Sequence, residues 1–379
     1  MCSRNRRPVS SSLRRPATVA ALLALSVLAS ACGGSVATPA PTEAVATAAT
    51  VPSATPAPAT PTEAPATPAP GPVTVRLALD WTPNTNHTGF YVADQEGWYA
   101  DAGVKLEVLP YGGTAPEAVL AAHQAECGIS FQDSLTFAAA AGAPVVSVMA
   151  ILQHTAQEIA VLDSSSIERP KQLDGKTYAG FGYPNEVPTL QSVIRADGGT
   201  GEFDSVMLDT AAYEALYSRR ADFVITFTAW EGIEAGQRGI GLRTFKFTDY
   251  GFPDFYQVVL ACDREWLDRD PVTAKAFVAA TVKGFEYATT NPQDAAAKLI
   301  AANPGVFDAN PALAEQSAVY MATQGLLVDA AGKVGTQTLD EWTGYSKFLY
   351  EQGLLTDASG NALTAAPDYA SLFTNDVLP

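Results

Sequence analysis

The segment Val73–Gly113 constrains the fold of this chain more than any other part of the sequence. Apolar residues alternate with other residues over 73–79, as in a half-buried β-strand, and a polar loop that contains a proline follows over 80–89. A short helical pattern over 90–96 then leads to a second alternating strand over 103–109. This order predicts a βαβ unit whose first loop stands at the carboxyl end of a strand, where α/β proteins bind ligands.

Strand-like and helix-like patterns continue to alternate along the chain, which predicts an α/β protein. Further strands are expected over 127–131, 144–152, 158–162, 176–179, 205–208, 222–227, 240–248 and 256–262. Further helices are expected over 116–125, 135–141, 187–196, 211–218, 271–289, 293–301, 311–324, 337–352 and 366–373. Two sets of βα units, a return strand and a run of helices indicate two lobes with a cleft between them.

The return strand implies that the chain crosses between the lobes twice. We expect the crossovers near 162–165 and 250–253. The first lobe then consists of 73–163 plus 252–379, including the C-terminal helices, and the second lobe consists of 164–251.

Charge excludes some classes of partner. The 379 residues carry a net charge of −17, and the first 31 residues hold five arginines and no acid. The remainder therefore holds 18 Lys and Arg against 40 Asp and Glu, a net charge of −22. So acidic a chain is a poor binder of nucleic acid or of anionic membranes.

The N-terminal residues have the pattern of an export signal. A basic stretch precedes an apolar run over 17–29, which is too short to span a bilayer, and small residues then precede Cys32. We expect 1–31 to be a signal peptide and Cys32 to carry a lipid anchor at the extracytoplasmic face of the cell membrane. Cleavage by an ordinary signal peptidase after Ala31 is the alternative. Residues 32–72, rich in Ala, Thr and Pro, are expected to form a linker.

Two cysteines, Cys127 and Cys262, lie in strand-like surroundings in the folded region. We expect two buried free thiols, and a disulfide outside the cytoplasm is the alternative. The three histidines, at positions 87, 123 and 154, show no metal-ligand spacing.

Several motifs occur in the same order as in a known family. They are Asp80–Asn84 with His87, Gly97–Tyr99, Gly103-Val104, Cys127–Ser130, Ile167–Gly175, Arg220–Phe223 and Asp263–Leu267. Together they span about 73–300 and resemble the NMT1/THI5-like family. One branch of that family holds solute-binding proteins of ABC importers with a periplasmic binding protein fold (type II-like), which bind riboflavin or pyrimidine precursors of thiamine.

The other branch of the family holds synthases that make the thiamine pyrimidine. Those enzymes use a Cys-rich iron motif, a lysine that binds pyridoxal phosphate, and a sacrificial histidine. Here Phe252–Tyr256 stands in place of the Cys-rich motif, and Ser130 and Ser134 stand in place of the other two groups. The resemblance therefore implies a binding protein without cofactor, and a synthase is the weaker alternative.

Four residues of the loop over 80–89 are candidates for ligand contact. The indole of Trp81 offers a π face to a planar ring, or packs between loop and helix. Asn84 offers a donor and an acceptor to a heterocycle edge, or serves the turn. Asp80 accepts from a ring N–H or caps the turn, and His87 contacts the ligand or has a structural role.

Further candidates follow other strands. Gln132 is positioned to read a ring edge, and Tyr183, in the Gly-rich turn over 180–183, is positioned to cover a ligand. Glu186 pairs with a polar group of the ligand or is solvated. Tyr91, in the helix after the first loop, and Tyr256, at the return crossover, are added to the expected contacts.

The end of the strand over 222–227 leads into Thr228, Trp230 and Glu231. We expect Thr228 and Trp230 to contact the ligand, with Trp230 facing Trp81 across the cleft in an aromatic sandwich. The aromatic candidates favour riboflavin as the ligand, with formylaminopyrimidine or hydroxymethylpyrimidine as the alternative. The expected partners are a permease with its ATPase subunits, and the protein is expected to be a monomer. A surface adhesion module is a third, distinct reading.

Overall fold

The computed structural model describes residues 71–379, so the predicted signal peptide, Cys32 and most of the predicted linker lie outside the described residues. The strands are β1 Val73–Ala78, β2 Val104–Leu109, β3 Cys127–Ser130, β4 Val145–Ala150, β5 Gln157–Leu162, β6 Thr177–Gly180, β7 Asp204–Met207, β8 Val224–Phe227, β9 Leu242–Lys246 and β10 Val259–Asp263. The helices before the return strand are α1 Thr88–Gln95, α2 Trp98–Asp101, α3 Pro116–Ala121, α4 Gln132–Ala140, α5 Glu186–Ala196, α6 Ala211–Tyr217 and α7 Ile233–Gln237. Those after it are α8 Arg264–Arg269, α9 Pro271–Thr290, α10 Pro292–Ala302, α11 Pro311–Thr323 and α12 Leu339–Glu351.

The first lobe is built on a five-stranded sheet in the order β2-β1-β3-β10-β4. Strand β1 runs parallel to β2 and β3, as the βαβ prediction requires. The return strand β10 is antiparallel to both of its neighbours. All five residues of β10 are buried, which accounts for its continuous apolar sequence.

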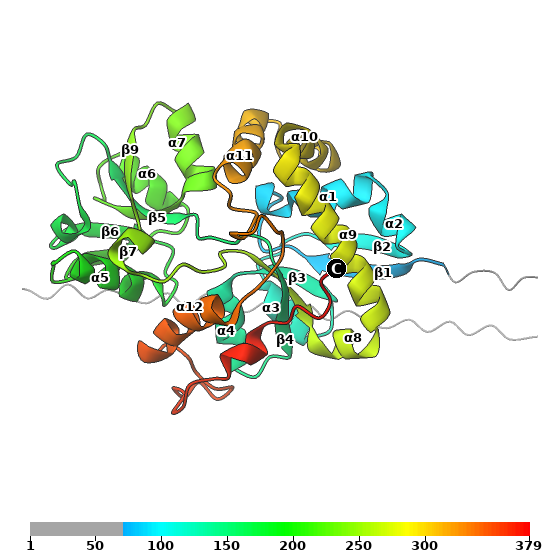
Figure 1. Ribbon diagram of the computed structural model, residues 1–379. Coiled ribbons are helices and arrows are strands. Elements are labelled where there is room, and N and C mark those ends of the chain that lie inside the picture. The colour runs from blue at the N-terminus through cyan, green and yellow to red at the C-terminus, as the bar shows by residue number, and fades with distance from the viewer. Residues whose placement is uncertain (1–70) are drawn as a thin grey trace, which may run out of the picture. The chain divides into compact units, whose positions relative to one another are not determined.

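The second lobe repeats this order. Strands β8, β5 and β9 form one sheet and β6 and β7 another, and Phe223, just before β8, bridges to Tyr178 of β6. The combined order is β7-β6-β8-β5-β9, with β5 antiparallel to both neighbours in the place that β10 takes in the first lobe. Figure 1 shows β5, β6, β7 and β9 on the left, β3 and β4 near the centre and β1 and β2 on the right.

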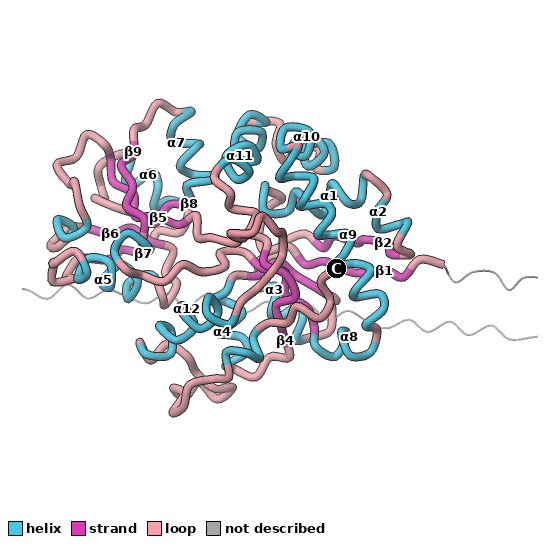
Figure 2. Tube along the Cα trace, in the orientation of Figure 1, coloured by secondary structure: helices cyan, strands magenta, loops and turns pink. Residues whose placement is uncertain are grey.

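The position of β5 corrects one expectation. The predicted crossover near 162–165 assigned this strand to the first lobe, but β5 pairs only with strands of the second. The chain therefore crosses between the sheets over 151–156 and returns over 247–258 (Figure 2). An apolar segment such as Ile159–Val161 suits either core, so its own sequence does not decide which sheet it joins.

The expectation of two free thiols is wrong. Cys127 and Cys262 form a disulfide, with an S–S distance of 2.00 Å. They face each other because β3 and β10 are antiparallel neighbours in the register that pairs Cys262 with Cys127. The pairing depends on this register, which the sequence alone does not show.

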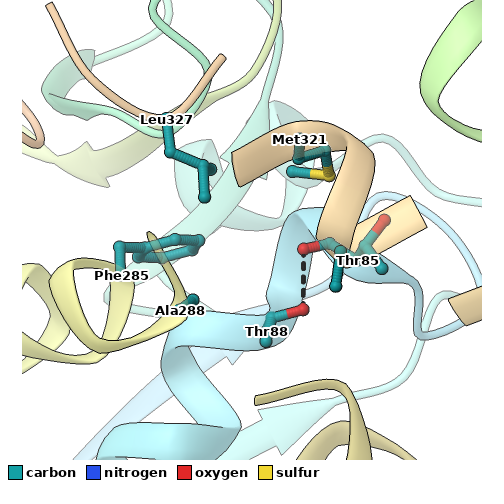
Figure 3. Close-up of a pocket in the computed structure, with 7 residues that line it drawn as sticks. Thr85, Thr88, Phe285, Ala288, Met321 and Leu327 are labelled. Atoms are coloured by element: carbon teal, nitrogen blue, oxygen red, sulfur yellow. Dashed lines mark hydrogen bonds between the residues drawn. The ribbon is translucent and has the colours of Figure 1, made fainter. Parts of the chain in front are cut away.

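Two glycines let helix α1 cross α9 at very short range. A Cβ on Gly89 would lie 2.3 Å from the ring of Phe285, and a Cβ on Gly284 would lie 2.0 Å from the carbonyl oxygen of Gly89. Beside this crossing is a cavity of about 10 Å³, which Figure 3 shows between Thr88, Phe285, Met321 and Leu327. It is too small for a ligand and is a packing defect in the first-lobe core.

The C-terminal region holds the helices α9 to α12, close to the predicted ranges. The helix expected over 366–373 is instead a single 3-10 turn, Tyr369–Leu372. The short helices α2, α7 and α8 were not expected. Within residues 71–379, no helix combines the length and the apolar character that a membrane span requires.

Candidate functional site

The ends of parallel strands from the two lobes meet at one place. Asp133 stands in the first turn of α4, directly after β3, and Asn185 precedes α5, after β6. Asn185 donates from Nδ2 to the Oδ2 atom of Asp133 over 2.7 Å and to the Tyr345 hydroxyl over 2.7 Å. This link joins the strand ends of the two lobes, so the loops at these ends form the candidate ligand site.

The loop after β1 is held by its own side chains. Nδ1 of His87 accepts from the backbone N–H of Asn84 at 3.2 Å, so the ring proton is on Nε2, which donates to Asp80 Oδ1 at 2.8 Å. The side chain of His87 is fully buried. Asn84 accepts from the N–H of Asn86 and donates to the carbonyl of Thr82. These contacts match the structural roles that were given as alternatives to ligand contact for Asp80, Asn84 and His87.

Aromatic rings from both lobes line this place. Trp81 is 45% exposed, and its ring centroid lies 5.5 Å from that of Tyr111, which follows β2. In the second lobe, Tyr183 is 63% exposed and stacks with Phe181 at 6.5 Å. Burial raises the pKa of Tyr183, and the nearby Tyr111 adds to that shift. Rings of both lobes therefore share one environment.

Carboxyl groups gather around these rings. In the first lobe, Glu117 is buried and accepts from the hydroxyl of Ser130. Burial raises its pKa, and the charges of Asp133 and Asp80 add to that shift. The pKa of Asp133 is also raised by burial. Because no lysine or arginine among residues 71–379 pairs with Glu117, Asp133 or Asp80, the site favours a ligand that donates hydrogen bonds or carries positive charge.

In the second lobe, Glu186 fills the turn that precedes its own helix. It accepts from the backbone N–H of Phe181 at 3.1 Å and of Gly182 at 3.0 Å. A Cβ on Gly180 would lie 2.4 Å from Oε2 of Glu186, so glycine is needed there for the carboxylate to fit. These amides would otherwise attract an anion, and the protein's own carboxylate occupies them.

Glu231 is a carboxyl group of the second lobe with one uncompensated oxygen. It lies in the π-helical turn Thr228–Gly232 after β8, and its Oε2 is buried without a hydrogen-bond partner. Burial raises the pKa of Glu231 to about 7, and the charge of Glu234 adds to the shift. A buried carboxyl oxygen without a partner costs free energy unless a ligand supplies the hydrogen bond.

Comparison with known proteins decides the family. Residues 84–295 match the family described as NMT1/THI5 like. The chain belongs to the NMT1/THI5-like family.

Relatives in the NMT1/THI5-like family have two kinds of name. A formylaminopyrimidine-binding protein of Halalkalibacterium halodurans is 29% identical over 59% of this chain and 68% of the relative. A 4-amino-5-hydroxymethyl-2-methylpyrimidine phosphate synthase of Legionella pneumophila is 25% identical over 61% of this chain and 74% of that enzyme.

Solved structures show the same fold as this NMT1/THI5-like chain. The periplasmic aliphatic sulphonate binding protein of Escherichia coli aligns with a TM-score of 0.59 and 15% identity, over 80% of this chain and 97% of that one. At this identity the similarity is one of fold. It confirms the predicted α/β fold of a two-lobed periplasmic binding protein.

Two of the predicted contacts in this NMT1/THI5-like chain are engaged within the protein. Gln132 is fully buried, donates to the carbonyls of Glu341 and Trp342, and accepts from the N–H of Tyr256. The Tyr256 hydroxyl accepts from the N–H of Thr338, and burial raises its pKa to about 12. These bonds join α4, the return crossover and α12, and ligand contact by Gln132 and Tyr256 stays a prediction.

Tyr91, Trp230 and Thr228 also make contacts within the protein. Tyr91 and Trp230 belong to one apolar cluster with Leu299 and Phe307. Thr228 donates from its N–H and its hydroxyl to the carbonyl of Ala156. The ring found against Trp81 is that of Tyr111, and the proposed sandwich of Trp81 with Trp230 stays a prediction.

Other residues of the site had little signal in the sequence. Tyr111 and Glu117 follow the second expected strand without a motif, and Asn185 precedes a helix as many turn residues do. Glu231 was noted beside Trp230 without a role. A carboxyl group a few residues after a strand end is the sequence feature that could have identified Glu231.

Proposed function

We propose that this chain is the solute-binding protein of an ABC importer and that it binds an aminopyrimidine precursor of thiamine, such as formylaminopyrimidine. The observation that carries the proposal is the buried, unpartnered Oε2 of Glu231 in the π-helical turn after β8, close to the ring of Tyr213 in the second lobe. A planar ring with an amine and a ring nitrogen on one edge supplies what this carboxyl group lacks.

The chemistry of a 4-aminopyrimidine edge matches a carboxyl group whose pKa is about 7. The amine donates to one carboxyl oxygen, and the adjacent ring nitrogen either accepts a proton from the other oxygen or holds it as a cation. Both arrangements give two parallel hydrogen bonds, which are stronger when charge assists them. Stacking on Trp81 or Tyr183 would cover the faces of the ring.

The surrounding acids favour a pyrimidine over riboflavin. Glu117, Asp133 and Asp80 make the site acidic, and an isoalloxazine ring is not basic. The relatives described above are named for pyrimidines. The expectation of riboflavin, which came from the number of aromatic candidates, is therefore replaced by its alternative.

Binding rather than synthesis is supported by the site residues. The resemblance places Ser130 where the synthases have one of their chemical groups, and its hydroxyl donates to Glu117. The neighbouring fold relatives include a periplasmic binding protein. The expected location outside the cytoplasm, the lipid anchor at Cys32 and delivery to a permease complete the proposal.

Titration of the purified protein tests the proposal. We expect formylaminopyrimidine to bind at one site and change the fluorescence of Trp81, and we expect riboflavin emission to stay unquenched. Quenched riboflavin with no pyrimidine binding would reverse the assignment. Uptake of iron and pyridoxal phosphate with turnover would replace it by a synthase.

A further inference from the structure

A cluster of ligand-type side chains that the proposed function does not use lies at the crossovers. His154 stands on the first crossover, Asp254 on the return crossover and Glu341 in the first turn of α12. One nitrogen or oxygen atom from each of these residues lies within 4.8 Å of the others. Three segments that are far apart in the sequence thus bring one imidazole and two carboxyl groups together.

The geometry holds two of these groups in place. Asp254 accepts with Oδ1 from the backbone N–H of Thr155 at 3.0 Å and of Phe255 at 2.9 Å. Its other oxygen, Oδ2, lies 2.7 Å from Nδ1 of His154. The carboxylate is therefore fixed by the backbone, and its Oδ2 faces the imidazole of His154, where a metal ion would replace the proton that these two atoms share.

Access to the cluster is open. A cavity of about 210 Å³ is lined by His154 and Asp254 together with Thr228, Lys246 and Tyr320. The side chains of His154 and Asp254 are 44% and 34% exposed. An ion can therefore reach the cluster and keep water on its remaining positions.

The local charge is not balanced within the cluster. Asp254 and Glu341 are both acids, and the imidazole of His154 is the basic group between them. Lys246 and Glu158 also line the cavity, and their opposite charges offset each other, so the two acids of the cluster face only the imidazole. A dication would supply the missing positive charge.

We propose that His154, Asp254 and Glu341 form a site for a divalent transition metal of the zinc type, which ties both crossovers to helix α12. Zinc takes nitrogen and carboxylate ligands at about 2.0–2.2 Å, which places tetrahedral ligand atoms about 3.3–3.6 Å apart. The present separations need only small side-chain shifts to reach that geometry. Water completes the coordination from the cavity.

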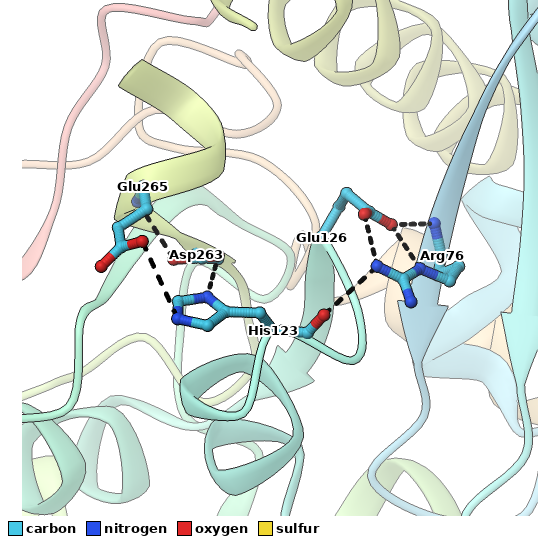
Figure 4. A network of polar contacts seen from close by, with 5 residues as sticks. All are labelled: Arg76, His123, Glu126, Asp263 and Glu265. Atoms are coloured by element: carbon cyan, nitrogen blue, oxygen red, sulfur yellow. Dashed lines mark hydrogen bonds and ion pairs between the residues drawn. The ribbon is translucent and has the colours of Figure 1, made fainter. Parts of the chain in front are cut away.

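The other histidine cluster of the first lobe provides a control with the same residue types. Figure 4 shows the ring of His123 between two acids, with Nδ1 2.8 Å from Asp263 and Nε2 3.8 Å from Glu265. Because the two carboxyl groups bind opposite edges of the ring, they do not converge on one point. A metal site requires convergence, and this arrangement is an ion-pair network that continues through Arg76 and Glu126 on its other side.

The test is calorimetric titration with Zn²⁺ of the full, tag-free chain after treatment with EDTA. Cys2 and Cys32 are replaced by serine in every sample, because the other two cysteines are in the disulfide and no free thiol then remains. We expect one Zn²⁺ per chain, and we expect Glu341→Gln and His154→Ala each to weaken binding about tenfold or more. His123→Ala is expected to bind as the parent chain does.

Several results would overturn the proposal. One is a parent chain that binds no Zn²⁺, and another is a Glu341→Gln chain that binds Zn²⁺ with unchanged affinity. Equal binding of Mg²⁺ that is insensitive to His154→Ala would also overturn it, because it would indicate an oxygen-only site. Circular dichroism in EDTA checks that each variant is folded, and Glu341→Gln keeps the size of the side chain.

Discussion

The two lobes have the same strand order but use the polar groups at their strand ends differently. In the first lobe, Asp80, Asn84 and His87 bind one another, and a disulfide joins the neighbouring strands β3 and β10. In the second lobe, Glu231 Oε2 and Asn185 Oδ1 are buried without partners. Asn86 Oδ1 is a similar atom in the first-lobe loop, so the contrast is one of degree.

This contrast assigns different tasks to the two lobes. A loop whose polar groups are already paired keeps its shape and presents the ring of Trp81 at little entropic cost. A carboxyl group without a partner gains most from a ligand, so it contributes more to specificity. We infer that the first lobe provides a rigid aromatic surface and the second lobe recognises the ring edge.

The largest expected effect is on the disulfide of the first lobe. The bond closes a loop of 135 residues, so replacing both Cys127 and Cys262 with serine is expected to lower the free energy of unfolding by about 2–5 kcal/mol. Urea denaturation measures the loss, and Cys32→Ser is the control. Hydrogen exchange should increase in β3 and β10 more than in β6 and β8. An equal increase in both lobes would break the comparison.

The next effect concerns the closed network of the first loop. His87→Ala leaves Asp80 and the N–H of Asn84 without their buried partner, so we expect a loss of about 2–4 kcal/mol in the free energy of unfolding. His123→Ala, on a half-exposed ring, is expected to cost about 1 kcal/mol or less. If His87→Ala kept full stability and lost ligand binding, His87 would be a ligand contact and the loop would not be self-contained.

Glu231→Gln tests the second lobe. Losing a charge-assisted hydrogen bond of about 1.5–3 kcal/mol weakens binding of formylaminopyrimidine roughly 10- to 100-fold. Calorimetric titration measures the affinity, and the melting temperature should be unchanged or higher because a buried charge is removed. Glu234→Gln, one turn later on the partly exposed side of α7, is the matched control. Equal weakening by both variants would show only a general charge effect.

The last effect is on the pH dependence of stability without ligand. The pKa of Glu231 is about 7 in the folded protein, against an ordinary value of 4.5. The folded state therefore binds more protons between these values, and its stability decreases as pH rises from about 4.5 to about 7. Urea denaturation at several pH values should show a smaller decrease for Glu231→Gln. The same slope in both proteins would mean that Glu231 ionises normally.

Much of the fold could be predicted from the sequence because periodicity reports burial directly. The strands over 73–79 and 256–262 have alternating or continuous apolar patterns that fit their places in the sheet. The sheet that β5 joins and the pairing of Cys127 with Cys262 depend on register and on contacts between distant segments. Neither is encoded in a local pattern.

The sequence indicates which loops hold the candidate site, but it does not indicate the contacts within them. The loops after β1, β6 and β8 were all identified, since ligand loops follow strand ends. Which polar groups bind one another could not be predicted, because His87 reaches Asp80, and Gln132 reaches Tyr256, only in the folded arrangement. A lone carboxyl group such as Glu231 becomes notable only when burial and missing partners are known.

The position of β10 between β3 and β4 determines which of the two lobes can be completed first. All strands of the second lobe, β5 to β9, precede β10 in the chain, so they are available while the position between β3 and β4 is still vacant. During synthesis or export, the lobe that starts first is thus the last to be completed. A chain that stopped before Val259 would present two unpaired strand edges, and such edges invite association with other chains.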